Sequence, residues 1–303
     1  MRRLLIVVTL LVVPVVAQAQ TATARTAPAK KTAPAHYGSN PAAGATFTHD
    51  GVKLYYEVYG TGEPLLMVHG NGGSIFDLSM QIAYFRRQYR VIAMDSRDQG
   101  KSADSVGSLT YEKMADDLAA LLDHLQVPAA NVLGWSDGGI EALLLGIRHP
   151  AKVKKIVSMA ANLNPSDKAL RPDVLELVKK MMADVPAAAR NTPEGKRELK
   201  VTGMMLVEPN IDVKALEKIT APTMILASDH DVIADEHTLD IYHHIPNSQL
   251  AIFPDALHTI PWDDPARFNA TVERFLRTPF RKINRIDDTV KSLEQMRAAQ
   301  GAP

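Results

Sequence analysis

The stretch GWSDGG, residues 134–139, decides how the rest of the chain is interpreted. It follows residues 131–133 (NVL), which are short and apolar enough for a buried strand, and it precedes residues 140–145, where apolar side chains recur at helical spacing. Ser136 is therefore expected where a strand turns into a helix. Residues 134–138 fit the pattern G-x-S-x-G, whose glycines allow a strained turn that presents a serine hydroxyl at the carboxyl edge of a sheet.

Two backbone N–H groups near Ser136 are expected to stabilise a developing negative charge. Asp137 would lie in the first turn of the helix, where free N–H groups and the helix dipole favour an oxyanion. The loop HGNGGS, residues 69–74, follows a strand predicted to be buried and would supply the second donor from the backbone of Asn71. We expect His69 to order this loop.

A serine hydroxyl needs a base and a third group that orients the base. In this arrangement the acid and the histidine follow the serine along the chain, each after a late strand. His258 alone among the ten histidines comes after the last predicted core strand, residues 248–256. Two carboxylates follow the preceding strand, and we prefer Asp231 as the acid because it lies farther past the strand end. Asp229 is better placed to hold the turn and remains the alternative.

The rest of the chain predicts an α/β protein with a mostly parallel central sheet flanked by helices. Residues 46–60 are expected to form a hairpin with Asp50-Gly51 at its turn. After it, predicted strands and helices alternate. The strands are expected at 64–70, 89–96, 131–135, 153–161, 222–229 and 248–256, and the helices at 75–88, 111–125, after Ser136, 235–245 and 265–276. Thr110 or Ser108 is expected to cap the helix from 111.

The alternation stops near residue 162 and resumes at 222, which leaves a helical stretch too long for a simple connection. We therefore predict a core in two parts, residues 45–163 and 219–277, with a helical cap inserted at 164–218. The tail, residues 278–303, has apolar side chains three or four positions apart and predicts a short amphipathic helix with an ordinary packing role. The chain shows no internal repeat.

Residues 1–19 read as a secretory signal peptide, because two arginines precede an apolar run that ends in the small-residue pattern Ala17-Gln18-Ala19. The alternative is a membrane anchor, but the run is shorter than the roughly 20 apolar residues of a spanning helix. Residues 20–44, rich in Ala, Thr, Pro and Lys, predict a disordered linker. We therefore expect a periplasmic or secreted protein with no stable membrane insertion after cleavage.

The composition limits the classes of molecule that the protein is expected to bind. The 303 residues carry 34 basic and 34 acidic side chains, so the formal net charge is zero and nothing favours nucleic acid. The chain has no cysteine, which excludes a thiol nucleophile and a disulfide scaffold. A small molecule is the expected partner, with no metal and no cofactor.

A dinucleotide-binding enzyme is one alternative. Gly70-Asn71-Gly72 follows a strand and Asp95 closes the next strand, as in a nicotinamide-binding unit. However, Ile75 stands where the third glycine of G-x-G-x-x-G would be. This alternative, an NAD-dependent oxidoreductase, also leaves Ser136 and His258 without a role.

The motifs HGNGGS, DSRDQGKS, GWSDGG, ASDHD and ALH stand in the order typical of serine hydrolases with the α/β-hydrolase fold, which this chain resembles over roughly residues 44–277. GWSDGG is similar to the valacyclovir-hydrolase-like esterase branch, and this resemblance implies ester hydrolysis. The chain departs from its relatives at Asp98-Gln99, where they commonly have Gly-His. A serine as nucleophile argues against the dehalogenase and epoxide-hydrolase branches, which use aspartate.

The expected activity is hydrolysis of small carboxylic esters through an acyl-enzyme on Ser136, with His258 as base and Asp231 as acid. Asp137 and Trp135 are expected to contact the substrate. Asp137 has two possible roles: its carboxylate can simply complement the dipole at the helix start, or it can recognise substrate. A carboxylate beside an oxyanion opposes catalysis unless it is turned away, solvated or matched by a cation, and the last case points to esters that carry an amine. A hydrolase fold that has lost activity and acts as a binding protein is the other alternative.

Overall fold

The computed structural model describes residues 36–102 and 106–300. The predicted signal peptide and most of the predicted linker lie outside these residues.

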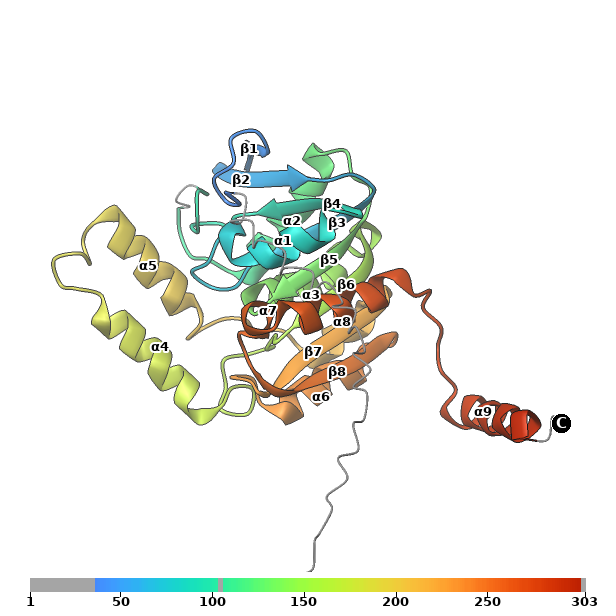
Figure 1. Cartoon of the computed structure of the whole chain (residues 1–303). Helices are drawn as coiled ribbons and strands as arrows, with labels where there is room; N and C mark the ends of the chain where they lie inside the picture. Colours follow the sequence, from blue (N-terminus) through green and yellow to red (C-terminus); the bar gives the residue numbers. More distant parts are fainter. Residues whose placement is uncertain (1–35, 103–105, 301–303) are drawn as a thin grey trace, which may run out of the picture. The chain divides into compact units, whose positions relative to one another are not determined.

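An eight-stranded sheet forms the centre of the fold, with strand order β1-β2-β4-β3-β5-β6-β7-β8 (Figure 1). The hairpin strands β1 and β2 are antiparallel to each other, and β2 is antiparallel to β4, whereas all other neighbours are parallel. This confirms the mostly parallel sheet. The strands are β1 Gly44–His49, β2 Val52–Tyr59, β3 Glu63–Val68, β4 Tyr89–Met94, β5 Ala130–Trp135, β6 Val153–Met159, β7 Thr223–His230 and β8 Ser248–Leu257.

Helices cover both faces of the sheet (Figure 1). Successive side chains of a strand point to opposite faces, so Leu65 and Leu66 of β3 enter two different apolar clusters. The cluster with Leu66 includes residues of α2 Tyr111–His124, α3 Asp137–Arg148 and α6 Asp235–His244. The cluster with Leu65 includes residues of α1 Ser79–Phe85, α7 Ile260–Asp263 and α8 Pro265–Arg277. Both faces are therefore buried, which explains the continuous apolar runs of the strands.

Two helix starts show how local sequence sets the element boundaries. The Thr110 side chain accepts a hydrogen bond from the Lys113 backbone N–H at 3.3 Å, and α2 begins at the next residue, as expected. The helix expected at 75–88 is instead a 3-10 turn, Ile75–Leu78, followed by α1. Ser74 and Asp77 form a capping box around the turn, and α1 ends at Phe85.

The described end of the predicted linker belongs to the folded chain. Tyr37 is buried, with 4% of its surface exposed. The Glu57 carboxylate of β2 accepts hydrogen bonds from the backbone N–H groups of Gly38 at 2.7 Å and Asn40 at 2.9 Å. The prediction that disorder extends to residue 44 is therefore wrong. Its cause is a buried carboxylate on the hairpin, whose need for hydrogen-bond donors the linker composition did not reveal.

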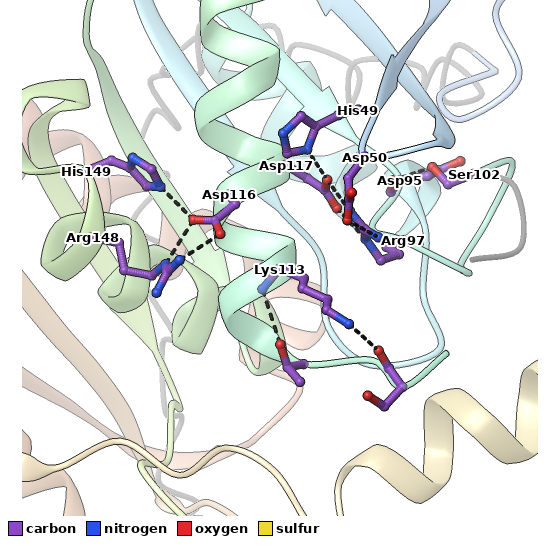
Figure 2. A network of polar contacts seen from close by, with 12 residues as sticks. His49, Asp50, Asp95, Arg97, Ser102, Lys113, Asp116, Asp117, Arg148 and His149 are labelled. Atoms are coloured by element: carbon purple, nitrogen blue, oxygen red, sulfur yellow. Dashed lines mark hydrogen bonds and ion pairs between the residues drawn. The ribbon is translucent and has the colours of Figure 1, made fainter. Parts of the chain in front are cut away.

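A network of polar side chains fastens the β1–β2 hairpin to α2 (Figure 2). Asp117 of α2 is fully buried and accepts hydrogen bonds from Arg97 at 2.6 and 2.8 Å. His49, at the end of β1, lies 2.7 Å from the same carboxylate. The preceding residue, Asp116, binds Arg148 and His149 at the end of α3. Two successive aspartates of α2 thus hold the hairpin on one side and α3 on the other.

The chain between β6 and β7, residues 160–222, is called the insert below. It contains α4 Pro172–Asp184, α5 Pro193–Met204 and a 3-10 turn at Val213–Lys218. Each of the two α-helices starts with proline, which fits the first helical position because its missing N–H would have no partner there. The insert is therefore helical, as its length and pattern indicated.

The tail contains α9 Arg285–Gln300, which is longer than the short helix expected. None of its residues is buried, and the exposed fractions of Ile286, Val290 and Leu293 are 69%, 47% and 48%. The ordinary packing role expected for this helix is therefore wrong within the part of the chain that the structure describes. Over the same residues, no helix combines the length and apolar character needed to cross a membrane.

Candidate active site

Ser136 lies in a tight turn between β5 and α3. Its backbone has φ 57° and ψ −119°, a left-handed conformation that residues other than glycine rarely adopt. The turn requires glycine at two neighbouring positions. A Cβ at Gly134 would overlap with the Gly138 carbonyl group, and a Cβ at Gly138 would overlap with the carbonyl of Val68. The glycines therefore let the turn pass close to backbone on both sides, as the G-x-S-x-G pattern predicted.

The structure brings Ser136, His258 and Asp231 together from the ends of three strands. The Oγ of Ser136 lies 3.0 Å from Nε2 of His258, and Nδ1 of the same imidazole lies 2.7 Å from Oδ1 of Asp231. Both distances are those of hydrogen bonds. The Asp231 side chain is 1% exposed and that of His258 is 20% exposed. A serine, an imidazole and a buried carboxylate in this order can activate the hydroxyl for nucleophilic attack.

Backbone N–H groups hold the Asp231 carboxylate in place. Its Oδ1 accepts hydrogen bonds from the N–H groups of Val232 at 2.8 Å and Ile233 at 3.4 Å, and its Oδ2 accepts one from Ser228 at 3.2 Å. The insert also reaches this loop, because Nε of Arg171 donates to the Asp231 carbonyl oxygen at 3.3 Å. The acid is thereby oriented by its own loop and by a residue of the insert that the sequence did not single out.

Asp229 has a different set of partners. Its carboxylate accepts hydrogen bonds from the backbone N–H groups of Asp255 at 2.9 Å and Ala256 at 3.1 Å, near the end of β8. These two bonds lower the pKa of the Asp229 carboxyl group. The Asp229 side chain therefore joins the ends of β7 and β8, in keeping with a role in holding the turn. The aspartate that binds His258 is Asp231.

Trp135 contacts the histidine. Its indole Nε1 donates a hydrogen bond of 2.9 Å to the backbone carbonyl oxygen of His258, and the two ring centres lie 5.9 Å apart. Trp135 is absent from the described residues that line the cavity at Ser136. The observed contact is therefore with the histidine rather than with a space for substrate.

The loop at residues 69–74 packs against the serine. A Cβ at Gly70 would lie 3.2 Å from Cβ and 3.8 Å from Oγ of Ser136, so the loop approaches the hydroxyl at the residue before Asn71. His69 is fully buried and orders the loop: its Nδ1 lies 2.7 Å from the Gly70 carbonyl oxygen, and its Nε2 accepts from the Ser96 N–H at 3.0 Å. Neither backbone N–H of Asn71 and Asp137 has a hydrogen-bond partner among the described residues.

Asp137 is 4% exposed and its carboxylate has two neutral donors. Nδ2 of Asn71 donates to Oδ2 at 2.8 Å, and the Tyr111 hydroxyl also forms a hydrogen bond with this carboxylate. Burial raises the pKa of Asp137, and the two donors oppose the shift. The same Asn71 amide donates to the Val201 carbonyl oxygen of α5 at 3.1 Å, so this side chain links the loop, the first turn of α3 and the insert.

Beside Ser136 lies a cavity of about 60 Å³. Its wall is mostly apolar with a few polar groups, and it is formed by Tyr111, Ser136, Asp137, Asn162, Leu170, Val174, Val178, Met205, Glu208, Val232 and Ile233. Tyr111 and Glu208 are the functional candidates that the sequence reasoning missed. The start of α2 marked Tyr111 only as a helix boundary, and nothing in the local pattern of Glu208 indicated that the insert places it in the wall of this cavity.

A second buried carboxylate lies one helical turn below Asp137. Glu141 is fully buried, and its Oε1 accepts a hydrogen bond from the Ser96 hydroxyl at 3.2 Å. Its Oε2 has no partner among the described residues. Burial, together with the nearby Asp137, raises the pKa of Glu141 well above its usual value. The first two turns of α3 thus carry two buried acidic side chains, Asp137 and Glu141, close to the serine.

At residues 98–99, where the family commonly has Gly-His, this chain has the charged Asp98 in place of glycine. Asp98 has φ 63° and its side chain is 1% exposed. Its carboxylate forms an ion pair of 2.6 Å with Lys200 of α5. The loop after β4 is therefore tied to the insert by a charged contact that glycine could not make.

The dinucleotide alternative depended on Asp95, whose carboxylate is already bound by backbone N–H groups. Its carboxylate accepts hydrogen bonds from the N–H groups of Ile75 at 2.8 Å and Lys101 at 2.7 Å. A ribose would have to displace one of them. Within the described residues, no group of three or more His, Asp or Glu side chains is arranged to hold a metal ion.

Comparison with known proteins agrees with this architecture. The family model for the alpha/beta hydrolase fold matches residues 63–199. The chain is 27% identical to 3-oxoadipate enol-lactonase 2 of Acinetobacter baylyi, over 77% of this chain and 96% of the relative. It is 26% identical to serine hydrolase BPHL of Mus musculus, over 75% and 84% of the two chains. A thermophilic esterase from Thermogutta terrifontis has a similar structure, with a TM-score of 0.60, 26% identity and coverage of 77% and 96%.

The fold, the family match and these relatives identify the protein as a hydrolase with the α/β-hydrolase fold. Within that class it resembles the valacyclovir-hydrolase-like esterases, the branch indicated by GWSDGG and represented among the relatives by BPHL.

Proposed function

We propose that the protein is an exported serine hydrolase that cleaves small carboxylic esters through an acyl-enzyme. The observation that carries this proposal is the pair of hydrogen bonds in which His258 lies 3.0 Å from the Ser136 hydroxyl and 2.7 Å from Asp231. Two similar proteins are named as an enol-lactonase and an esterase, and these names support hydrolysis of an ester bond.

The mechanism follows from these contacts. Asp231 accepts a hydrogen bond from Nδ1–H of His258, which leaves Nε2 free to accept the proton of Ser136 as Oγ attacks the ester carbonyl carbon. The N–H groups of Asp137 and Asn71 stabilise the oxyanion. His258 then gives the proton to the leaving alcohol oxygen, and the C–O bond breaks. Water, deprotonated by the same imidazole, hydrolyses the acyl-enzyme and returns the proton to Ser136.

The cavity supports a small acyl group. A water-sized group needs roughly 10–15 Å³ of such space, so the cavity of about 60 Å³ corresponds to roughly four to six of them. Asp137 and Glu208 line the same space. Because their negative charges would favour a protonated amine, we propose that short amino-acid esters are preferred over uncharged esters of equal size.

The experiment that tests the serine mechanism is labelling with a fluorophosphonate, which reacts with activated serines. We expect the wild-type protein to be labelled and Ser136→Ala to be unlabelled, with ester turnover reduced by several orders of magnitude. Ser108→Ala, at an exposed serine after β4, is the matched control and should keep both properties. A folded wild-type protein that is neither labelled nor active on esters would contradict the proposal and favour a silent binding protein.

Export is part of the proposal and depends on residues 1–19 alone. We propose cleavage after Ala19 and a periplasmic or secreted mature protein, because the charged start, the apolar run and the small residues follow the order of a signal peptide.

A further inference from the structure

Two hollows meet at the same pair of valines. One is the cavity of about 60 Å³ beside Ser136. The other is a groove of about 740 Å³ that runs between α4 and the loop after β7. Val174 and Val232 line both of them, and the remaining lining residues belong to one or the other. The two side chains therefore form a wall between the space at the nucleophile and a much larger space outside.

The backbone on both sides of this wall is held by hydrogen bonds. Leu170 and Ile233 form an isolated antiparallel bridge between the insert and the loop after β7. In it, the Arg171 N–H donates to the Val232 carbonyl oxygen and the Ala234 N–H donates to the Ala169 carbonyl oxygen, both at 2.9 Å. These bonds fix the backbone of Val232 at the bridge. On the other side of the bridge, Val174 lies in the first turn of α4, four residues after Leu170.

The side chains of the wall are also stiff. Valine is branched at Cβ and in a helix occupies one strongly preferred rotamer, so Val174 cannot swing aside as a leucine or methionine could. Both valines are half-buried and pack against the apolar cluster on the α1 and α8 face of the sheet. A chain bound beside Ser136 that grows toward the groove would meet two methyl-bearing side chains with little freedom to move.

We infer that Val174 and Val232 limit the length of the group bound beside Ser136, and that removing either side chain joins the catalytic cavity to the outer groove. This inference rests on the proposed function, since it concerns the size of the ester that the site accepts. The groove offers apolar surface to an extended chain because Leu177, with 53% of its surface exposed, lines it together with the two valines. Arg171 and Lys180 lie at the same groove beside several carboxylates.

The test measures kcat/KM for two series of esters. In one series the acyl chain of nitrophenyl esters grows from two to ten carbons, and in the other the alcohol of acetate esters grows over the same range. Wild type should favour the short members of at least one series and decline steeply beyond about six carbons. In Val174→Ala and Val232→Ala the octanoate-to-acetate ratio, or its counterpart in the alcohol series, should rise at least tenfold. The gain should approach about fourfold for each methylene that enters the groove.

Two neighbouring residues of α4 serve as matched controls. Val178 lines the cavity alone and Leu177 lines the groove alone. Val178→Ala enlarges the cavity without opening it, so the preferred chain should lengthen by no more than one or two carbons. Leu177→Ala should leave the ratio for the two chain lengths unchanged. Thermal unfolding of each variant shows whether it is folded.

Two results would overturn this inference in distinguishable ways. If Val174→Ala and Val232→Ala are labelled by the fluorophosphonate and hydrolyse acetate esters, but neither series shifts toward longer chains, the wall does not limit the substrate. If wild type itself is folded, unlabelled and inactive on every ester, the proposed function fails, and the inference fails with it.

Discussion

The indole of Trp135 holds the backbone of His258, because its Nε1 donates a hydrogen bond of 2.9 Å to the carbonyl oxygen of that residue. The residue before the proposed nucleophile therefore braces the residue proposed as its base. This contact gives a reason for tryptophan in GWSDGG: the ring spans the distance between the end of β5 and the loop after β8. The alignment of Nε2 with the Ser136 hydroxyl depends on where that loop lies.

We expect Trp135→Phe to lower kcat by about two- to tenfold with little change in KM. Phenylalanine keeps most of the apolar ring but cannot donate to His258, and a hydrogen bond of this kind contributes about 0.5–1.5 kcal/mol. Steady-state kinetics on a short ester measures the effect. Trp262→Phe, which changes the other tryptophan of the chain, should leave kcat within twofold. An increase in KM without a loss of kcat would instead support direct contact between Trp135 and the substrate.

The roles of the two aspartates after β7 can be separated by substitution. Asp231→Asn should reduce kcat by about 10³- to 10⁴-fold, because the amide no longer fixes the tautomer of His258 or stabilises its cation. Asp229→Asn should lower kcat less than tenfold, since this side chain binds backbone N–H groups of β8. Equal losses in both variants, with the fold intact by circular dichroism, would contradict the assignment of Asp231.

Asp137 should select esters that carry an amine. We expect Asp137→Asn to reduce kcat/KM for a short amino-acid ester by about 5- to 150-fold, which corresponds to the roughly 1–3 kcal/mol of a charged hydrogen bond. An uncharged ester of the same size should change much less. The ratio of the two specificity constants is the measurement. An equal change for both esters would mean that Asp137 only stabilises the helix start.

Glu141 predicts how stability depends on pH. Its pKa in the folded protein is raised well above the usual 4.5 by burial. Between these two values the folded protein binds the proton and the unfolded chain does not, so the group's contribution to stability is lost as pH rises through this range. Glu141→Gln removes this loss because glutamine is neutral at every pH and can still accept from the Ser96 hydroxyl.

We therefore expect Glu141→Gln to have a higher Tm than wild type at pH 8 and a nearly equal Tm at pH 4, where the glutamate is mostly neutral in both states. Scanning calorimetry at the two pH values measures this difference. Each kcal/mol gained corresponds to an increase of about 2–4 °C for a chain somewhat smaller than this one. A Tm difference that is the same at both pH values would show that packing, rather than ionisation, separates the two proteins.

Export predicts the mass of the mature protein. When the full chain is produced in a bacterial host, the exported protein should begin at Gln20, and intact-mass measurement will show the loss of residues 1–19. Ala19→Pro should block cleavage at this site. If the protein without this substitution is recovered at full length from the membrane fraction of the host, residues 1–19 act as an anchor instead.

The sequence predicted the parts of the site that follow from strand order. Ser136, Asp231 and His258 each stand directly after a strand, and the carboxyl ends of parallel strands meet at one edge of a sheet. The preference for Asp231 over Asp229 rested on its position farther past the end of the predicted strand. In the structure β7 continues to His230, so only the later aspartate lies in a loop. The geometry that holds Asp229 to β8 agrees with that reasoning.

The residues that sequence reasoning missed belong to contacts between distant segments. Glu208 reaches the cavity from the insert, and Arg171 reaches the acid loop from the start of α4. Neither residue stands in a motif, and helical periodicity indicates which face is apolar without indicating which element it meets. The burial of Tyr37 was missed for a related reason, because its ring packs against Tyr59 of the hairpin, a segment distant in sequence.

The conformation of Ser136 sets folding stability against the proposed activity at one position. Its left-handed backbone costs on the order of 1–3 kcal/mol, which glycine would avoid. Selection for heat resistance alone would therefore favour Ser136→Gly, a change that discards the hydroxyl of the proposed nucleophile. Engineering a thermostable form has to exclude residue 136 from optimisation and gain its stability at positions remote from the turn, where the two requirements do not compete.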